Sequence, residues 1–255
     1  AISSKKIIAA AKWLERMSYQ RSDAVVLLSQ DLRANIANKI DEKFHQRLHV
    51  IPNFVDTHAI TPQDRMTAYR SELGIGDQLV VMYAGNVGFS QSLNLVVDAA
   101  AKFPDIAFVI NGDGAARKKL EEDCARLTNV YFGDYQPIER LSEVLATGDI
   151  HVVPLRAGLA SVSVPSKSYS ILAAGRPMLA AIDLGTEIPN MLQQSGAGVA
   201  VEPDNSAAFI EALSQLISRR EQLHEMGSRG RTWVETHASP ASVAAQYEAI
   251  FLANR

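Results

Sequence analysis

Cysteine is almost absent from this sequence of 255 residues, which contains Cys124 and no other. A single thiol excludes an internal disulfide and is typical of proteins that fold in a reducing compartment. No run of about 18 or more apolar residues occurs, so we expect no membrane-spanning helix. A surplus of basic residues is also missing, because the net charge is −3, and we therefore expect no nucleic-acid partner.

Metal ligands at a recognisable spacing are missing as well. The histidines are scattered along the chain and do not combine with aspartates in the pattern of a metal site. Protein metal sites need several such side chains that converge on one point. We therefore predict no bound metal and no cofactor.

Short apolar runs alternate with amphipathic segments along most of the chain. The predicted strands cover residues 24–28, 48–51, 79–84, 106–110, 130–132, 150–154, 178–181 and 198–201. The predicted helices cover residues 5–20, 29–40, 63–73, 92–101, 115–126, 138–146, 165–174, 186–194 and 206–219, with one more from Pro240. This alternation is typical of right-handed crossovers. The predicted fold class is therefore α/β, a doubly wound parallel sheet of the Rossmann type.

Residues 53–62 are rich in turn-forming types and show no sustained periodicity, so we place a linker there. The β-α-β fragment before the linker is too small to hold a hydrophobic core alone. At the other end, Ser239 and Pro240 are typical of a helix start. Val243 and Tyr247 belong to an apolar stripe on that helix, which needs a surface to cover.

Ligands of an open parallel sheet bind beyond the carboxyl ends of the strands, near the point where the strand order reverses. The loop after predicted strand 79–84 contains Gly85 and Gly88, which let the backbone approach a ligand closely. The helix predicted after this loop offers free N–H groups and the positive end of its dipole. The pattern fits phosphate binding and equally a tight turn.

A second glycine-rich loop follows the predicted strand 106–110. Gly112 and Gly114, with Asp134 about 20 residues further on, invite a dinucleotide-binding interpretation. Arg117 occupies the third glycine position, however, and the loop does not open the first βαβ unit. We therefore interpret this loop as a turn that shapes the wall of a pocket, and not as an NAD site.

The start of the predicted helix 165–174 is the most informative segment. Pro165 suits the first position of a helix, and Ser163, Ser166 and Lys167 suit phosphate oxygens. Backbone N–H groups at such a start bind anions, and Lys167 would add a point charge. The alternative is a capped surface helix with a solvated lysine.

Four segments together resemble motifs of the family 4 (group 1) glycosyltransferases. Residues 165–180 are similar to a signature of these enzymes, and residues 149–155 to the strand before it. Residues 50–56 resemble the linker between the two domains of the family. Residues 85–93 are similar to the first phosphate loop of a bacterial subgroup that makes O-antigen, capsule and colanic-acid sugars and includes fucosyl- and N-acetylfucosaminyl-transferases.

The resemblance implies the GT-B fold, in which two Rossmann-like domains face a cleft and the second binds most of the nucleotide-sugar donor. Residues 1–58 would then be the last part of the acceptor-side domain plus the linker. Residues 59–232 would form the donor-binding domain, and residues 233–255 a helix that crosses back to the first domain. We expect the rest of the N-terminal domain to be missing from this chain and to be its partner in the whole protein.

The resemblance also implies a donor site. Its residues would be Gly85, Asn86, Gly88, Gln91, Gly112, Asp113, Gly114, Tyr135, Ser163, Pro165, Ser166, Lys167 and Ser170. The first loop would approach the diphosphate, the start of helix 165–174 would hold it, and Tyr135 would lie near the base. Many family members have Glu at the positions of Val162 and Ser170, which puts ribose recognition by this chain in question.

The implied function is transfer of a sugar from a nucleoside-diphosphate sugar, UDP in preference to GDP, to a glycan or polyprenyl-linked acceptor of cell-surface polysaccharide. We expect a retaining enzyme and no activity from the fragment alone. Two alternatives stay open, a nucleotide-sugar epimerase of the same fold and a non-catalytic nucleotide-binding module.

The expected location is the cytoplasm, with the inner face of the plasma membrane as an additional possibility. Lys5, Lys6, Lys12 and Arg16 with Trp13 could let the first helix lie on a bilayer. Packing of this helix within a two-domain protein is the interpretation that we prefer.

Overall fold

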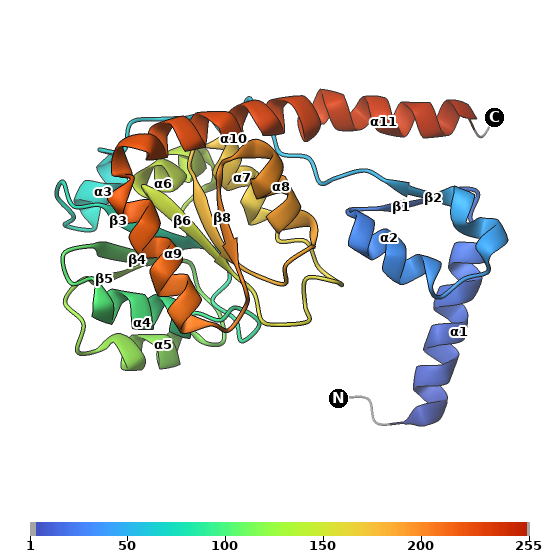
Figure 1. Cartoon of the computed structure of the whole chain (residues 1–255), viewed down its shortest axis with the longest axis horizontal. Coiled ribbons are helices and arrows are strands. Elements are labelled where there is room, and N and C mark those ends of the chain that lie inside the picture. Colours follow the sequence, from blue (N-terminus) through green and yellow to red (C-terminus); the bar gives the residue numbers. More distant parts are fainter. Residues whose placement is uncertain (1–3, 254–255) are drawn as a thin grey trace.

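Two parallel sheets, one small and one large, are present in the computed structural model, which describes residues 4–253 (Figure 1). The small sheet pairs two strands, with one helix before the first strand and two helical segments between the strands. Its elements are α1 (Lys5–Arg21), β1 (Val25–Leu27), α2 (Gln30–Ala37), the 3-10 helix η1 (Glu42–Arg47) and β2 (Leu48–Val50).

The large sheet has six parallel strands in the order β5-β4-β3-β6-β7-β8. These strands are β3 (Val80–Ala84), β4 (Ala107–Asn111), β5 (Val130–Gly133), β6 (Ile150–Pro154), β7 (Met178–Ala181) and β8 (Gly198–Val201). From β3 the chain winds outward to β5, returns to the centre and winds the other way from β6. The strand order therefore reverses between β3 and β6, as in a doubly wound sheet.

Helices cover both faces of this sheet (Figure 1). They are α3 (Ala68–Glu72), α4 (Asn94–Lys102), α5 (Arg117–Cys124), η2 (Ile138–Arg140), α6 (Leu141–Thr147), α7 (Lys167–Ala173), α8 (Glu187–Ser195), α9 (Ser206–Ser218), η3 (Arg220–Gln222) and α10 (Leu223–His237). A last helix, α11 (Pro240–Ala253), follows α10 and extends beyond this sheet. The core of one face holds side chains of α4, α5 and α9, and that of the other face holds side chains of α3, α6, α7 and α8.

Alternating side chains of each central strand enter these two cores. Val81 and Tyr83 point to the α4 and α9 face, whereas Val80 and Met82 point to the α3 and α6 face. All four are almost completely buried. A strand buried on both faces reads as a continuous apolar run, which is why the sequence predicts it readily. The α/β prediction is confirmed.

The predicted helix 63–73 is wrong at its start, since α3 begins only at Ala68. Asp64 accepts a hydrogen bond from the backbone N–H of Met66, which forms a turn. Thr67 then caps α3 by accepting a hydrogen bond from the N–H of Arg70 at 3.1 Å. Local side-chain bonds of Asp and Thr thus compete with the helix and shift its beginning.

Helix α10 is absent from the sequence-based assignment, and it contains two glycines. Both glycines permit close packing against the loop and helix beneath. A Cβ added to Gly227 would lie 1.9 Å from the carbonyl oxygen of Gly175, and one added to Gly230 would lie 2.7 Å from Leu172. Tertiary contact therefore overrides the low helix propensity of glycine here.

The linker is fastened to α10 by one guanidinium. Arg231 donates hydrogen bonds of 2.6 Å to the carbonyl oxygens of Thr57 and Ile60 in the linker and of Ala173 in α7. The N–H of Val55 also donates to the carbonyl oxygen of Ala238. These bonds hold the connection between the two sheets against the C-terminal helices.

Helix α11 continues from the large sheet toward the small one (Figure 1). Gln246 and Ala249 line a hollow together with strand β2, so the second half of α11 lies beside the small sheet. The apolar side chains of Trp13 in α1 and Phe251 in α11 are more than 60% exposed. Within residues 4–253 no helix is long and apolar enough to cross a membrane.

We expect Gly227→Ala to destabilise the protein, because the new methyl group would overlap the backbone at Gly175. Overpacking of this kind costs roughly 1–3 kcal/mol of unfolding free energy. Urea denaturation of the variant and the parent measures this loss. Gly76→Ala is the matched control, since its Cβ would meet nothing nearer than 3.7 Å. Equal stability of the two variants would contradict the packing assigned to α10.

Candidate functional site

A cavity of about 210 Å³ opens at the carboxyl edge of the large sheet, where the strand order reverses. This is the position at which doubly wound sheets bind ligands. The ends of β3 and β4, the loop after β5, and helices α6 and α7 all contribute to it. Its lining residues are Ala84, Gly85, Asn111, Tyr135, Gln136, Pro137, Ile138, Leu141, Val144, Leu145, Lys167, Ser170 and Ile171.

Three neighbouring loops at this edge are joined by backbone hydrogen bonds. The N–H of Gly85 donates to the carbonyl oxygen of Asn111, and that of Val87 to Asp113, both at 2.9 Å. The N–H of Gly112 donates in turn to the carbonyl oxygen of Gly133 at 2.9 Å. The pairing of β3, β4 and β5 therefore continues beyond the strands and fixes the loops to one another.

This close approach leaves room only for glycine at two positions. A Cβ on Gly112 would lie 2.0 Å from the carbonyl oxygen of Gly85, and one on Gly114 would lie 2.4 Å from that of Val87. Both glycines also have positive φ, 131° and 158°. Residues with a side chain rarely adopt such a backbone, so the steric and conformational demands coincide.

Lys167, the first residue of α7, extends from the opposite side of the reversal point to the first loop. Its Nζ lies 3.8 Å from the centroid of the Tyr83 ring. A Cβ placed on Gly85 would lie 2.9 Å from the same Nζ. Gly85 thus leaves the space through which the ammonium group reaches the edge of the sheet.

The charge of Lys167 is poorly compensated by the protein. Burial lowers the pKa of Lys167 from its usual 10.5 to about 7. No carboxylate of residues 4–253 lies within 4.0 Å of its Nζ. The ring of Tyr83 supplies a cation–π contact, which stabilises an ammonium much less than a buried ion pair does. An anionic ligand would restore the missing partner.

Free backbone donors lie at the start of α7. The carbonyl oxygens of Pro165 and Ser166 accept from Ser168 and Tyr169 at 3.1 Å and form the first turn. The N–H groups of Ser166 and Lys167 have no acceptor within the described part of the chain. Such N–H groups, together with a lysine, form an arrangement suited to phosphate oxygens.

The remainder of the cavity wall is largely apolar. Leu141, Val144 and Leu145 of α6 form its floor beside Ile171. Tyr135 and Ile138 stand at the rim with 58% and 73% of their surfaces exposed. An aromatic ring and a large aliphatic side chain at the mouth of such a cavity can cover a flat heterocycle.

Four of the predicted site residues line this cavity, namely Gly85, Tyr135, Lys167 and Ser170. The other nine lie around it and not on its wall. Those in the interlocked loops are Asn86, Gly88, Gln91, Gly112, Asp113 and Gly114, and those before α7 are Ser163, Pro165 and Ser166. The loop residues support one another, since Gln91 accepts a hydrogen bond from the N–H of Gly88 at 3.2 Å.

Sequence reasoning missed two polar residues of the site. Tyr83 faces Lys167 and donates a hydrogen bond to the carbonyl oxygen of Asn86 at 2.5 Å. Asn111 donates to the hydroxyl of Tyr69 at 2.8 Å and to the carbonyl oxygen of Asp134 at 2.6 Å. A polar Asn that ends an otherwise apolar strand was a usable signal, whereas nothing in the sequence indicates the ring beneath Lys167.

Carboxylates do not line this cavity within residues 4–253. Val162, at a position where the resembling family often has Glu, is 62% exposed and lies outside it. In the same described residues, no group of three or more His, Cys, Asp or Glu side chains is placed to hold a metal ion. The wall thus offers one cation and an apolar surface, with the free N–H groups of Ser166 and Lys167 at the start of α7.

Comparison with protein families matches residues 78–219, more than half of the chain, to the family described as glycosyl transferases group 1. Two curated relatives are each 29% identical to the chain. One is the probable glycosyltransferase WbjE of Pseudomonas aeruginosa, with 78% of this chain and 50% of the relative aligned. The other is the putative colanic acid biosynthesis glycosyl transferase WcaI of Escherichia coli K12, with 83% and 54% aligned.

The chain therefore spans about half the length of these curated relatives. Among solved structures, that of HepE from Anabaena in complex with UDP and glucose is similar at a TM-score of 0.80 and 15% identity. The match covers 94% of this chain and 67% of HepE. This likeness shows the fold, which is that of GT-B glycosyltransferases.

Lys167→Met is expected to stabilise the ligand-free protein near neutral and acidic pH. Below about pH 7 the lysine is charged in both the folded and the unfolded chain, so the folded state bears the whole cost of burying it. Between that pH and the usual pKa of 10.5, only the unfolded chain keeps the proton, and the stability of the parent rises with pH.

Thermal denaturation of the parent and the variant at about pH 6 and about pH 9 tests this sign. The variant should melt higher at the lower pH, and the difference should shrink at the higher pH. Lys118→Met, at an exposed position without a polar partner in the described residues, is the control and should show no such trend. A difference that is the same at both pH values would contradict the burial of a charged Lys167.

Proposed function

The chain belongs to the group 1 glycosyltransferase family, and from this premise we propose that it binds the nucleoside-diphosphate part of a sugar donor in the cavity between β3 and β6. The donor proposed is a UDP-sugar in preference to a GDP-sugar. The sugar is transferred to a glycan or polyprenyl-linked acceptor, with retention of configuration at the transferred carbon.

One observation carries this proposal, the ammonium group of Lys167 held beside Gly85 without a carboxylate partner in the described residues. When a glycosidic bond to a diphosphate breaks, negative charge grows on the departing phosphate oxygens. A fixed cation and free N–H groups at that place stabilise this charge at little cost in reorganisation. The start of α7 provides both.

Two further observations support a UDP-sugar. The apolar wall and the exposed Tyr135 ring provide a surface on which a pyrimidine can rest. The similar fold of HepE was solved with UDP and glucose. Ser170 lines the cavity and offers a hydroxyl in reach of a ribose, a weaker partner than the Glu that many family members have there.

The acceptor and the whole protein belong to the proposal as well. Because the chain spans about half of its relatives, we propose that residues 1–58 complete an acceptor-side domain and that residues 59–232 are the donor domain. Residues 233–255 would then connect the two domains. The name of WcaI, a putative colanic acid biosynthesis glycosyl transferase, supports a role in cell-surface polysaccharide. The location proposed is the cytoplasm, with the inner face of the plasma membrane as an additional site and α1 as a candidate contact.

The cavity wall favours transfer over epimerisation. An epimerase of this fold relies on carboxylates in the cleft, and within the described residues no Asp or Glu side chain lines this cavity. A non-catalytic nucleotide-binding module would have the same cavity wall and bind a nucleotide, but it would transfer no sugar. An assay of the full-length protein with a polyprenyl-linked acceptor separates sugar transfer from nucleotide binding without catalysis.

Calorimetric titration of the chain with UDP and with GDP tests the proposed donor site. We expect UDP to bind, and more tightly than GDP. Lys167→Met should weaken UDP binding at least tenfold near neutral pH, since a charge-assisted contact is worth roughly 1.5–3 kcal/mol. Raising the pH above about 7 should weaken binding to the parent as well, because Lys167 then loses its proton.

Lys118→Met is again the matched control and should bind UDP as the parent does. The proposal would be wrong if neither nucleotide bound to a folded parent protein. It would also be wrong if Lys118→Met and Lys167→Met lowered the affinity equally, because the effect would then reflect net charge and not the position of Lys167.

A further inference from the structure

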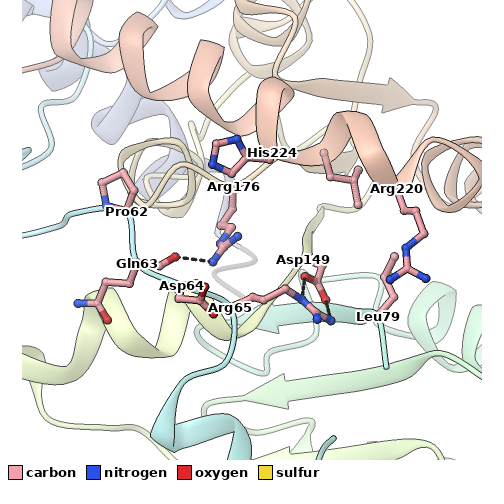
Figure 2. A pocket seen from close by; sticks show the side chains of 10 residues that line it. Pro62, Gln63, Asp64, Arg65, Leu79, Asp149, Arg176, Arg220 and His224 are labelled. Carbon is pink, nitrogen blue, oxygen red and sulfur yellow. Dashed lines mark hydrogen bonds and ion pairs between the residues drawn. The ribbon is translucent and has the colours of Figure 1, made fainter. Parts of the chain in front are cut away.

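A second and larger cavity, of about 510 Å³, lies at the opposite edge of the same sheet (Figure 2). Leu79 and Asp149, which precede β3 and β6, identify it as the amino edge. The linker, η3 and the start of α10 close the other sides. Its lining residues are Pro62, Gln63, Asp64, Arg65, Leu79, Asp149, Arg176, Arg220, Leu223 and His224.

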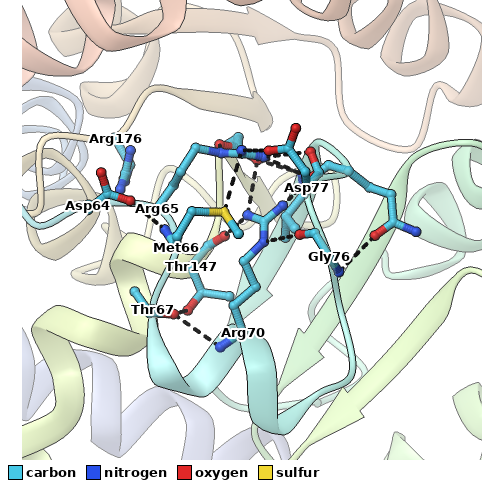
Figure 3. Close-up of polar contacts among 12 residues, drawn as sticks. Asp64, Arg65, Met66, Thr67, Arg70, Gly76, Asp77, Thr147 and Arg176 are labelled. Atoms are coloured by element: carbon cyan, nitrogen blue, oxygen red, sulfur yellow. Dashed lines mark hydrogen bonds and ion pairs between the residues drawn. The ribbon is translucent and has the colours of Figure 1, made fainter.

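Part of the charge around this cavity is structural and balanced (Figure 3). Arg65 forms ion pairs of 2.6 Å with both Asp77 and Asp149. The fully buried Arg70 lies 3.5 Å from Asp149 and donates to the carbonyl oxygens of Gly76 and Gln78. Asp149 therefore serves two arginines and, by accepting from the N–H of Val80 as well, joins β6 to β3.

Arg176 has no such balance. Its guanidinium donates to the carbonyl oxygen of Gln63 at 2.8 Å, but its buried Nε has no hydrogen-bond partner. No carboxylate of the described chain lies within 4.0 Å of it, and burial lowers the pKa of Arg176 from its usual value. A buried donor left without an acceptor is costly, and a phosphate oxygen would satisfy this one.

Arg220 adds a second unpaired guanidinium to the same cavity. Its exposed side chain forms neither an ion pair within 4.0 Å nor a hydrogen bond within residues 4–253, and Asp77, the carboxylate on which its charge acts, is already paired with Arg65. Figure 2 shows Arg176 extending beside His224 into the hollow, with Arg220 across from it. Of the two carboxylates in the wall, Asp149 is engaged by arginines, and Asp64, which accepts from the N–H of Met66, keeps a charge that acts on Arg176. The wall thus has positive charge to spare.

We propose that this cavity is a second anion site, which binds the phosphate group of a small phosphorylated compound between Arg176 and Arg220. A guanidinium presents parallel N–H donors that match two phosphate oxygens, and two guanidinium groups suit a phosphate or diphosphate. The site lies across the sheet from Lys167 and is independent of the proposed donor site. Arg176 belongs to the segment 165–180, where its position suggests only the end of a helix.

Titration of the whole chain with inorganic phosphate and with diphosphate, at constant ionic strength, tests this proposal. Both probes should bind in a Lys167→Met background, in which binding at the proposed donor site is weakened at least tenfold. Arg220→Gln should weaken binding about tenfold, as expected for loss of one charge-assisted contact. A preference for diphosphate over phosphate would identify the ligand as a diphosphate compound, and equal binding would identify a single phosphate group.

Arg219→Gln is the matched control, because Arg219 is the exposed neighbour of Arg220 and does not line the cavity. It should bind both probes as the parent does. Arg176→Met should abolish binding of both probes, provided that circular dichroism shows that this variant folds. If the variant does not fold, Arg220→Gln still tests the site, because Arg220 is exposed. Absence of binding in the Lys167→Met background, or equal losses in the Arg219 and Arg220 variants, would overturn the second site without affecting the proposed donor site.

Discussion

The candidate donor site depends on a steric constraint, the contact between the backbones of the loops after β3 and β4. The carbonyl oxygen of Gly85 occupies the space that a side chain at Gly112 would need. The pairing of β3 with β4 continues into these loops, whereas the pairing of β3 with β6 covers Val81 and Met82 and ends there. The end of β3 is therefore open on the β6 side, where Gly85 leaves room for Lys167. The position of the cation thus follows from how closely two strands and their loops approach, and not from a hydrogen bond made by the lysine itself.

This arrangement exchanges stability for binding. A lysine whose pKa is lowered to about 7 by burial weakens the ligand-free fold, and the contact with Tyr83 offsets only part of that cost. Because no carboxylate of the described residues pairs with Lys167, a bound phosphate would supply the negative charge that the buried ammonium group lacks. A buried charge without a partner in an otherwise well-packed domain is typical of a functional site.

The α/β class, most elements and the three loops could be predicted, because strands buried on both faces and glycine-rich turns leave strong local signals. Helix α10 could not, since Gly227 resembles a helix breaker until the backbone at Gly175 is known to lie against it. The ring of Tyr83 beneath Lys167 was also out of reach. The two residues are far apart in sequence, and a Tyr in an apolar strand is an ordinary core residue.

The reversal of strand order gives the two edges of the sheet different roles. At the amino edge, Asp149 joins β6 to β3 and draws Arg65 and Arg70 around it, so charge there mainly holds the two halves of the sheet together. At the carboxyl edge the halves diverge, and Lys167 reaches the gap without an anion. Arg176 lies beside the ion pairs of Asp149 but takes part in none of them, so it resembles Lys167 in having no carboxylate partner in the described residues. A sheet that needs buried arginines to fasten its centre therefore has guanidinium groups in place from which an anion site can form.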